Sequence, residues 1–251
     1  MRRAFVAFAA LLVVVAVTQT AAAGRGPSGE ITVFAAASLT EPFEAIAKQF
    51  EKKYPGVDVR FNFDASSNLA AQIQQGAPAD VFASADEANL QKAVDSGDVT
   101  AEPVVLARNR LEIAVEAGNP EKVRGLADLD ESGLVVVLCA DAVPCGKYAT
   151  EAFAKAGVTV NAASKEENAK ATLSKVSLGE ADASVVYVTD VKAAKGDVSG
   201  VRIPDRQNVI ATYPIAVAEQ AKNSAAAKAW VQFIQSKEAQ KTLRKFGFLA
   251  P

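Results

Sequence analysis

Residues 31–50 read ITVFAAASLTEPFEAIAKQF, and this stretch predicts the fold class. Ile31 to Ala37 is a short apolar run of the kind that forms a buried strand. Apolar residues then recur at helical spacing, and Pro42 is tolerated because it falls in the first turn of the expected helix. A buried strand that leads directly into an amphipathic helix is the repeating unit of an α/β fold.

The same alternation continues along the chain. Short runs that are apolar, or that alternate apolar with polar residues, are separated by helical patterns, which favours an α/β sheet over an all-helical or all-strand protein. Further strands are expected at 57–63, 80–85, 134–138, 184–188 and 213–218, and helices at about 147–156 and 166–178.

The pattern changes near Val104, where two extended runs, 104–106 and 111–115, stand on either side of Arg108-Asn109-Arg110. A second α/β unit follows, and the C-terminal segment is able to return to the first unit. We therefore predict two lobes with a cleft between them. The expected lobes are residues 30–106 plus 213–251 for the first and residues 107–212 for the second.

The N-terminus has the features of an export signal. Met1-Arg2-Arg3 is positively charged, 4–17 is apolar, and small residues follow up to Gly24. We expect residues 1–23 to be a signal peptide cleaved near Ala23, with an uncleaved anchor as the alternative. Residues 24–29 are expected to form a flexible tether. No Cys stands near this junction to accept a lipid.

Charge and composition exclude several classes of function. The formal net charge is −2, and no cluster of Lys and Arg occurs, which argues against a nucleic-acid partner. An anion site would have to be built from local groups rather than from a positive surface. The sequence has no His, so Ser-His-Asp and Cys-His catalysis are excluded, and two Cys are too few for a structural zinc site.

Those two cysteines, Cys139 and Cys145, lie close together in the sequence. Nearby cysteines of an exported protein usually pair, so a disulfide is expected, with two buried free thiols as the alternative. A bridge over so short a loop would stabilise the fold by only about 2 kcal/mol. Its larger effect would be to fix the shape of the loop.

Serines stand where strands turn into helices. Ser38 follows the first strand, and Ser66 with its neighbour Ser67 follows the second. They fit helix caps, and Ser38 with Glu41 also fits a capping box. The alternative is an anion site, because the start of a helix has unpaired N–H groups and a partial positive charge. Two such turns beyond neighbouring strands favour an anion pocket.

Three further segments can add donors to such a pocket. Pro144-Cys145-Gly146 is another strand-to-helix turn, in which Gly146 permits close approach of the backbone. Asn168-Ala169 begins a further helix. Tyr187 ends a strand, where its phenolic hydroxyl either donates to a ligand or the ring simply packs.

Three motifs in this order resemble the family of periplasmic molybdate-binding proteins. They are 33–39 (VFAAASL), 76–86 (GAPADVFASAD) and 179–187 (GEADASVVY), and the resemblance extends from Ile31 to Phe248. It implies a type II periplasmic-binding-protein fold, in which two lobes close over one oxyanion and present it to an ABC-importer membrane permease. The family's ligand positions fall on the hydroxyls of Ser38, Ser66 and Tyr187 and on the backbone N–H groups of Cys145 and Ala169.

Two positions depart from the family pattern, since Cys145 stands where a small non-sulfur residue is frequent and Ala169 where Val is common. Both act through the backbone, so neither change should abolish binding. The sequence therefore predicts a monomeric exported receptor for molybdate or tungstate, without catalysis or cofactor, which holds molybdenum only as the bound oxyanion. A receptor for sulfate or a phosphonate, an exported hydrolase and the sensing domain of a regulator are the alternatives.

Overall fold

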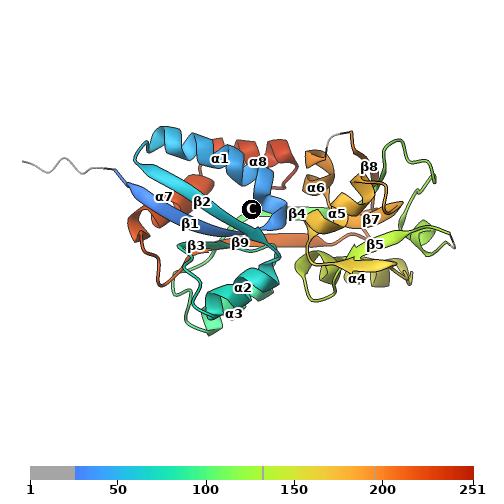
Figure 1. Ribbon diagram of the computed structural model, residues 1–251, viewed down its shortest axis with the longest axis horizontal. Coiled ribbons are helices and arrows are strands. Elements are labelled where there is room, and N and C mark those ends of the chain that lie inside the picture. The colour runs from blue at the N-terminus through green and yellow to red at the C-terminus, as the bar shows by residue number, and fades with distance from the viewer. Residues whose placement is uncertain (1–25, 132, 195) are drawn as a thin grey trace, which may run out of the picture.

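The computed structural model describes residues 26–131, 133–194 and 196–251, and it has the predicted mixed α/β fold (Figure 1). The expected signal peptide, residues 1–23, lies outside the described residues. The strands form one sheet in the order β2-β1-β3-β9-β4-β7-β5-β6, and β8 also pairs with β4. Among the described residues, no helix has the length and apolar character needed to cross a bilayer.

The first half of the sheet contains β1, β2, β3 and β9, and five α-helices pack around it (Figure 1). Strands β1 and β2 are parallel, as are β1 and β3, whereas β9 runs antiparallel to β3. The elements are β1 (Gly29–Ala36), the 3-10 helix η1 (Ala37–Leu39), α1 (Thr40–Lys53), β2 (Val57–Asp64), α2 (Ser66–Gln74), β3 (Val81–Ala83), α3 (Glu87–Asp95), β9 (Ile210–Val217), α7 (Ser224–Ile234) and α8 (Lys237–Phe246).

The second half contains β5 to β8 with three α-helices, and β4 joins the two halves (Figure 1). Strand β5 is parallel to both β6 and β7, while β4 is antiparallel to β7, β8 and β9. The elements are β4 (Val104–Glu116), the 3-10 helix η2 (Leu126–Asp130), β5 (Val136–Cys139), α4 (Pro144–Ala156), β6 (Ser164–Glu166), α5 (Ala169–Ser177), β7 (Ala183–Tyr187), α6 (Val188–Ala193) and β8 (Val198–Arg202).

The polar triplet 108–110 does not interrupt a strand, so the expectation of two separate extended runs is wrong. β4 is continuous because all three residues pair with β9, Asn109 lying opposite Ala211. Asn109 is fully buried, whereas Arg108 and Arg110 point to the other side of the strand and are partly exposed. From Leu111 onward β4 pairs with β7 instead. One strand therefore spans both halves of the sheet.

The start of α5 also differs from expectation. The helix expected from 166 begins at Ala169, because Glu166 is part of β6 and lies opposite Cys139 of β5. The shift places the beginning of α5 after a strand of the sheet. The remaining predicted strands are present with ends that differ by a few residues.

Aromatic side chains fill the core beside β1. Trp230 of α7 is fully buried, and its ring lies 5.6 Å from that of Phe43 and 5.3 Å from that of Phe50, both of α1. Phe233 packs against Phe50 at 5.5 Å. Helix α7 is thereby fixed to α1, which holds the helix that follows β1 and η1 in place.

This cluster gives a stability prediction. Replacing Phe50 by Ala should lower the free energy of unfolding by about 3–5 kcal/mol, because it removes a fully buried ring and leaves a cavity. Urea unfolding would measure the change. Leu178, which is 71% exposed, is the control, and Leu178→Ala should cost less than about 0.5 kcal/mol. Equal effects of the two substitutions would contradict this account of the core.

Candidate functional site

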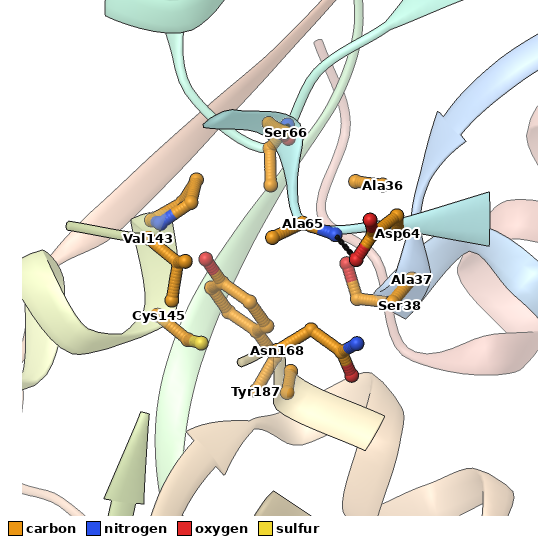
Figure 2. A pocket seen from close by; sticks show the side chains of 13 residues that line it. Ala36, Ala37, Ser38, Asp64, Ala65, Ser66, Val143, Cys145, Asn168 and Tyr187 are labelled. Atoms are coloured by element: carbon orange, nitrogen blue, oxygen red, sulfur yellow. Dashed lines mark hydrogen bonds between the residues drawn. The ribbon is translucent and has the colours of Figure 1, made fainter. Parts of the chain in front are cut away.

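One pocket between the two halves of the sheet collects all five residues that the family resemblance assigned to the ligand (Figure 2). Its empty volume is about 230 Å³, including the part that is open to solvent. The lining residues come from the ends of strands and the starts of helices in both halves. They are Ala36, Ala37, Ser38, Asp64, Ala65, Ser66, Ala85, Val143, Pro144, Cys145, Asn168, Ala169 and Tyr187.

Ser38 is not a helix cap. It lies inside η1, and the N-cap of α1 is Leu39, whose side chain accepts no hydrogen bond, so the capping box expected from Ser38 and Glu41 does not form. The Ser38 side chain is buried, and its Oγ lies 2.9 Å from the Oη of Tyr213 on β9. Because the hydroxyl serves no cap, it is available to a molecule in the pocket.

Ser66 and Ser67 have different surroundings. Ser66 is the first residue of α2, is buried and lines the pocket, whereas Ser67 is half-buried and does not line it. The Oγ of Ser66 accepts the backbone N–H of Ala85 at 2.9 Å. A backbone N–H can only donate, so the hydroxyl hydrogen of Ser66 is left for another acceptor. The pocket is the place where such an acceptor would lie.

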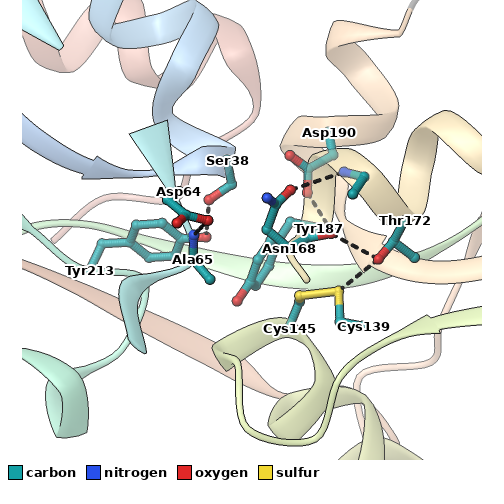
Figure 3. The surroundings of a disulfide bond; sticks show 11 residues. Ser38, Asp64, Ala65, Cys139, Cys145, Asn168, Thr172, Tyr187, Asp190 and Tyr213 are labelled. Atoms are coloured by element: carbon teal, nitrogen blue, oxygen red, sulfur yellow. Dashed lines mark hydrogen bonds between the residues drawn. A yellow bond between two sulfur atoms is a disulfide. The ribbon is translucent and has the colours of Figure 1, made fainter. Parts of the chain in front are cut away.

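Cys145 lies in the first turn of α4, where backbone N–H groups have no acceptor within the helix. The predicted disulfide to Cys139 is present, with the two Cα atoms 5.8 Å apart (Figure 3). Gly146 allows the loop to fold back on the helix, since a Cβ there would lie 2.1 Å from the carbonyl oxygen of Ala140. The bridge and the glycine together fix the start of α4 against the pocket.

Ala169 is the first residue of α5, and Asn168 caps this helix. The Oδ1 of Asn168 accepts the N–H of Ala171 at 2.9 Å, so that donor is occupied (Figure 3). The N–H of Ala169, at the pocket side of the helix, has no acceptor within the helix. Thr172 connects this helix to the disulfide, because its hydroxyl lies 3.2 Å from the Sγ of Cys139.

Tyr187 ends β7, and its side chain is 1% exposed. Its ring packs edge-on against Tyr213, with centroids 5.8 Å apart. Among the described residues, its hydroxyl is one of three buried polar side-chain atoms without a hydrogen-bond partner. Burial raises the pKa of this phenol well above its ordinary value, so it stays protonated. The side chain both packs and places an unused donor in the pocket (Figure 2).

The pocket lining includes no Lys or Arg, and Asp64 is its one acidic residue. The Asp64 carboxylate accepts the N–H of Ala65 at 2.6 Å (Figure 2) and the amide of Asn68 at 3.1 Å. These bonds hold the carboxylate against its own loop. Near the pocket, Lys170 of α5 pairs with Glu41 of α1, so an ion pair connects the two halves of the molecule.

Sequence reasoning missed two members of this region. Asp64 directly follows a predicted strand, and its polar character at that strand end was the available signal. Tyr213 had no such signal, because it looked like an ordinary member of an apolar strand. Its contact with Ser38 joins residues that are 175 positions apart in the sequence.

The chemistry that this arrangement supports is the binding of an anion. Helix starts and hydroxyls supply neutral donors, and oriented dipoles in a closed site attract a negative charge without any cationic side chain. Within the described part of the chain, no group of three or more Cys, Asp or Glu side chains is placed to hold a metal ion.

Known proteins resemble this chain in sequence and in fold. The model of the bacterial extracellular solute-binding protein family matches residues 31–249. The chain is 40% identical to the molybdate-binding protein ModA of Mycobacterium tuberculosis over 88% of its own length and 85% of that protein. It is 36% identical to ModA of Escherichia coli, covering 88% of this chain and 89% of that protein. The periplasmic molybdate-binding protein of Azotobacter vinelandii shares the fold, with a TM-score of 0.76 and 21% identity over 88% of this chain and 99% of that chain.

Asp190 behind the pocket gives a prediction about pH. Its buried carboxylate accepts the N–H of Tyr187 at 3.0 Å. Burial raises the pKa of Asp190 from 3.8 to about 7, although the Tyr187 N–H and Lys170 act in the opposite direction. At a pH between these two values, Asp190 is protonated in the folded chain and ionised in the unfolded chain. Its contribution to the free energy of unfolding therefore falls as pH rises from about 4 to about 7.

As pH rises from about 4 to about 7, the free energy of unfolding of Asp190→Asn should therefore fall less than that of the wild type. Urea unfolding at several pH values would measure both slopes. Asp205 is the matched control, because it is exposed and Arg202 lowers its pKa, which places its contribution below this range. Asp205→Asn should keep the wild-type slope. An unchanged slope in Asp190→Asn would show that Asp190 does not titrate there.

Proposed function

This chain belongs to the bacterial extracellular solute-binding protein family, and we propose that it captures molybdate or tungstate and delivers the oxyanion to an ABC-type membrane permease. Relatives named as molybdate-binding proteins, up to 40% identical over most of the chain, support this ligand class. The observation that carries the proposal is the pocket itself. Five predicted donors from separate segments line it, and no cationic side chain does.

The donors favour a fully deprotonated oxyanion. The proposed contacts are the hydroxyls of Ser38, Ser66 and Tyr187 and the N–H groups of Cys145 and Ala169, and all of them donate. An anion that carries its own O–H, such as hydrogen phosphate, would bring a donor that only a hydroxyl turned away from donating, or the Asp64 carboxylate already bonded to Ala65 and Asn68, could accept. Leaving such a donor unpaired in a buried site costs about 1–3 kcal/mol. Molybdate and tungstate carry no proton near neutral pH and avoid this cost.

The rest of the proposal concerns how the receptor works. The protein acts as an exported monomer, without catalysis or cofactor, once the signal peptide is cleaved near Ala23. The two lobes, 30–106 with 213–251 and 107–212, close over the ligand. The ion pair between Glu41 and Lys170 supports closure, because it connects helices of opposite halves next to the pocket. The closed surface is then the one that the permease recognises.

Thermal unfolding with molybdate, tungstate, sulfate and phosphate in turn tests the ligand. A ligand present at a thousand times its dissociation constant stabilises by about 4 kcal/mol. For a chain of this size the midpoint should rise by roughly 8–16 °C. We expect this rise with molybdate and tungstate only. A rise with sulfate instead would make the protein a sulfate receptor, and no rise with any of the four would reject the proposed ligand class.

Substitutions test the donors. Ser38→Ala and Ser66→Ala should each weaken molybdate binding at least about tenfold, or about 1.4 kcal/mol, which is near the lower end of what one hydrogen bond to a charged group contributes. Tyr187→Phe should weaken it by a smaller factor. Ser67→Ala is the matched control for Ser66, because Ser67 does not line the pocket, and should bind as the wild type does. Isothermal titration calorimetry would measure each affinity. Wild-type affinity in Ser38→Ala would remove Ser38 from the site.

A further inference from the structure

A chain of buried hydrogen bonds lies behind Ser38. The Oη of Tyr213 is 2.9 Å from the Oγ of Ser38 and 3.4 Å from the Nδ2 of Asn109. The same Nδ2 lies 2.9 Å from the Oγ1 of Thr189. All four residues are at most 3% exposed. They come from η1, β9, β4 and α6, so the chain of contacts reaches from one half of the molecule to the other (Figure 3 shows Ser38 and Tyr213).

One end of this chain has a fixed direction. The Oδ1 of Asn109 accepts the backbone N–H of Arg110 at 2.9 Å. A backbone N–H can only donate, so the amide oxygen of Asn109 must be the atom that faces it. The amide nitrogen therefore faces Tyr213 and Thr189, and it can only donate to them.

The direction passes on through Tyr213. Its oxygen accepts from Asn109, and its single hydrogen can go to Ser38, a contact whose geometry fits either direction. Burial raises the pKa of Tyr213 far above its ordinary value, which keeps that hydrogen on the phenol. With Tyr213 as the donor, Ser38 is the acceptor of this hydrogen bond. Its own hydrogen must point elsewhere, and the open direction is the pocket that Ser38 lines.

We propose that Tyr213 and Asn109 are positioning residues that hold the Ser38 hydroxyl as a donor toward the bound oxyanion. This inference rests on the proposed function, since it assigns a direction to one of that site's donors. Without Tyr213, Ser38 could turn its lone pairs toward the anion, and a repulsive contact would replace an attractive one.

Ser66 provides an independent parallel. There the backbone N–H of Ala85 donates to the serine oxygen and leaves the hydroxyl hydrogen free. With the proposed direction, the two serines have the same arrangement, a buried donor behind the oxygen and the pocket in front. A backbone group fulfils this role for Ser66, whereas a side chain fulfils it for Ser38. Only the second case can be tested by substitution.

A double-mutant cycle on molybdate affinity tests the proposal. The proteins are the wild type, Ser38→Ala, Tyr213→Phe and the double variant, measured by isothermal titration calorimetry. Tyr213→Phe should weaken binding at least about fivefold in the wild type, equivalent to about 1 kcal/mol. In the Ser38→Ala background the same change should alter affinity less than about twofold, because the group through which Tyr213 acts is already absent.

Two controls separate positioning from packing. Tyr54→Phe removes a phenol far from the pocket and should leave affinity unchanged, and the unfolding midpoint of each ligand-free variant reports on folding. Asn109→Ala provides a second route if Tyr213→Phe does not fold, and its effect should likewise disappear in the Ser38→Ala background. The inference would be overturned if Tyr213→Phe weakened molybdate binding equally in the wild-type and Ser38→Ala backgrounds, or did not weaken it at all. A loss of affinity in Ser38→Ala would still support the proposed function in either case. A wild type that does not bind molybdate would overturn both.

Discussion

The first backbone N–H groups of a helix have no hydrogen-bond acceptor within that helix, and the arrangement of the pocket depends on these unpaired donors. Helix starts η1, α2, α4 and α5 all meet at one pocket, and Tyr187 at the end of β7 adds a phenol. Donors that the protein leaves unpaired in a buried place have to be satisfied by something else. A small anion does so, and because the donors are neutral, binding needs no positively charged surface. This explains how a chain with a net charge of −2 can bind an anion.

Three of the five proposed donors are held in place by a neighbouring group. The N–H of Ala85 stands behind Ser66, Tyr213 behind Ser38, and the Cys139–Cys145 bridge fixes the start of α4. Burial makes this possible, since hydrogen bonds in a region of low dielectric hold their geometry more strictly than they would in water. The residues behind the pocket lining therefore determine where a donor lies and also in which direction it donates.

The fold and most of the pocket could be predicted because they depend on local patterns. Strand-to-helix turns are visible in the sequence, and the carboxyl ends of neighbouring parallel strands lie at one edge of a sheet, so Ser38 and Ser66 were expected together. Helix starts and a strand end also pointed to the segments of Cys145, Ala169 and Tyr187, and the family resemblance then assigned these residues to the ligand. Tyr213 and Asn109 could not be found in this way, because their role depends on contacts between residues far apart in sequence. The same holds for β4, whose polar triplet is kept in a strand by pairing with β9.

The position of β9 has a consequence for the order of folding. β3 and β4 do not pair with each other, and each pairs instead with β9, which is residues 210–217 of a chain of 251. Until those residues are available, the sheet consists of two parts with unjoined edges. A chain that leaves the ribosome or a membrane channel N-terminus first cannot complete its sheet until β9 has emerged. Tyr213 cannot contact Ser38 before that point either. The protein thus acquires its ligand-binding form late, as a property of nearly the entire polypeptide.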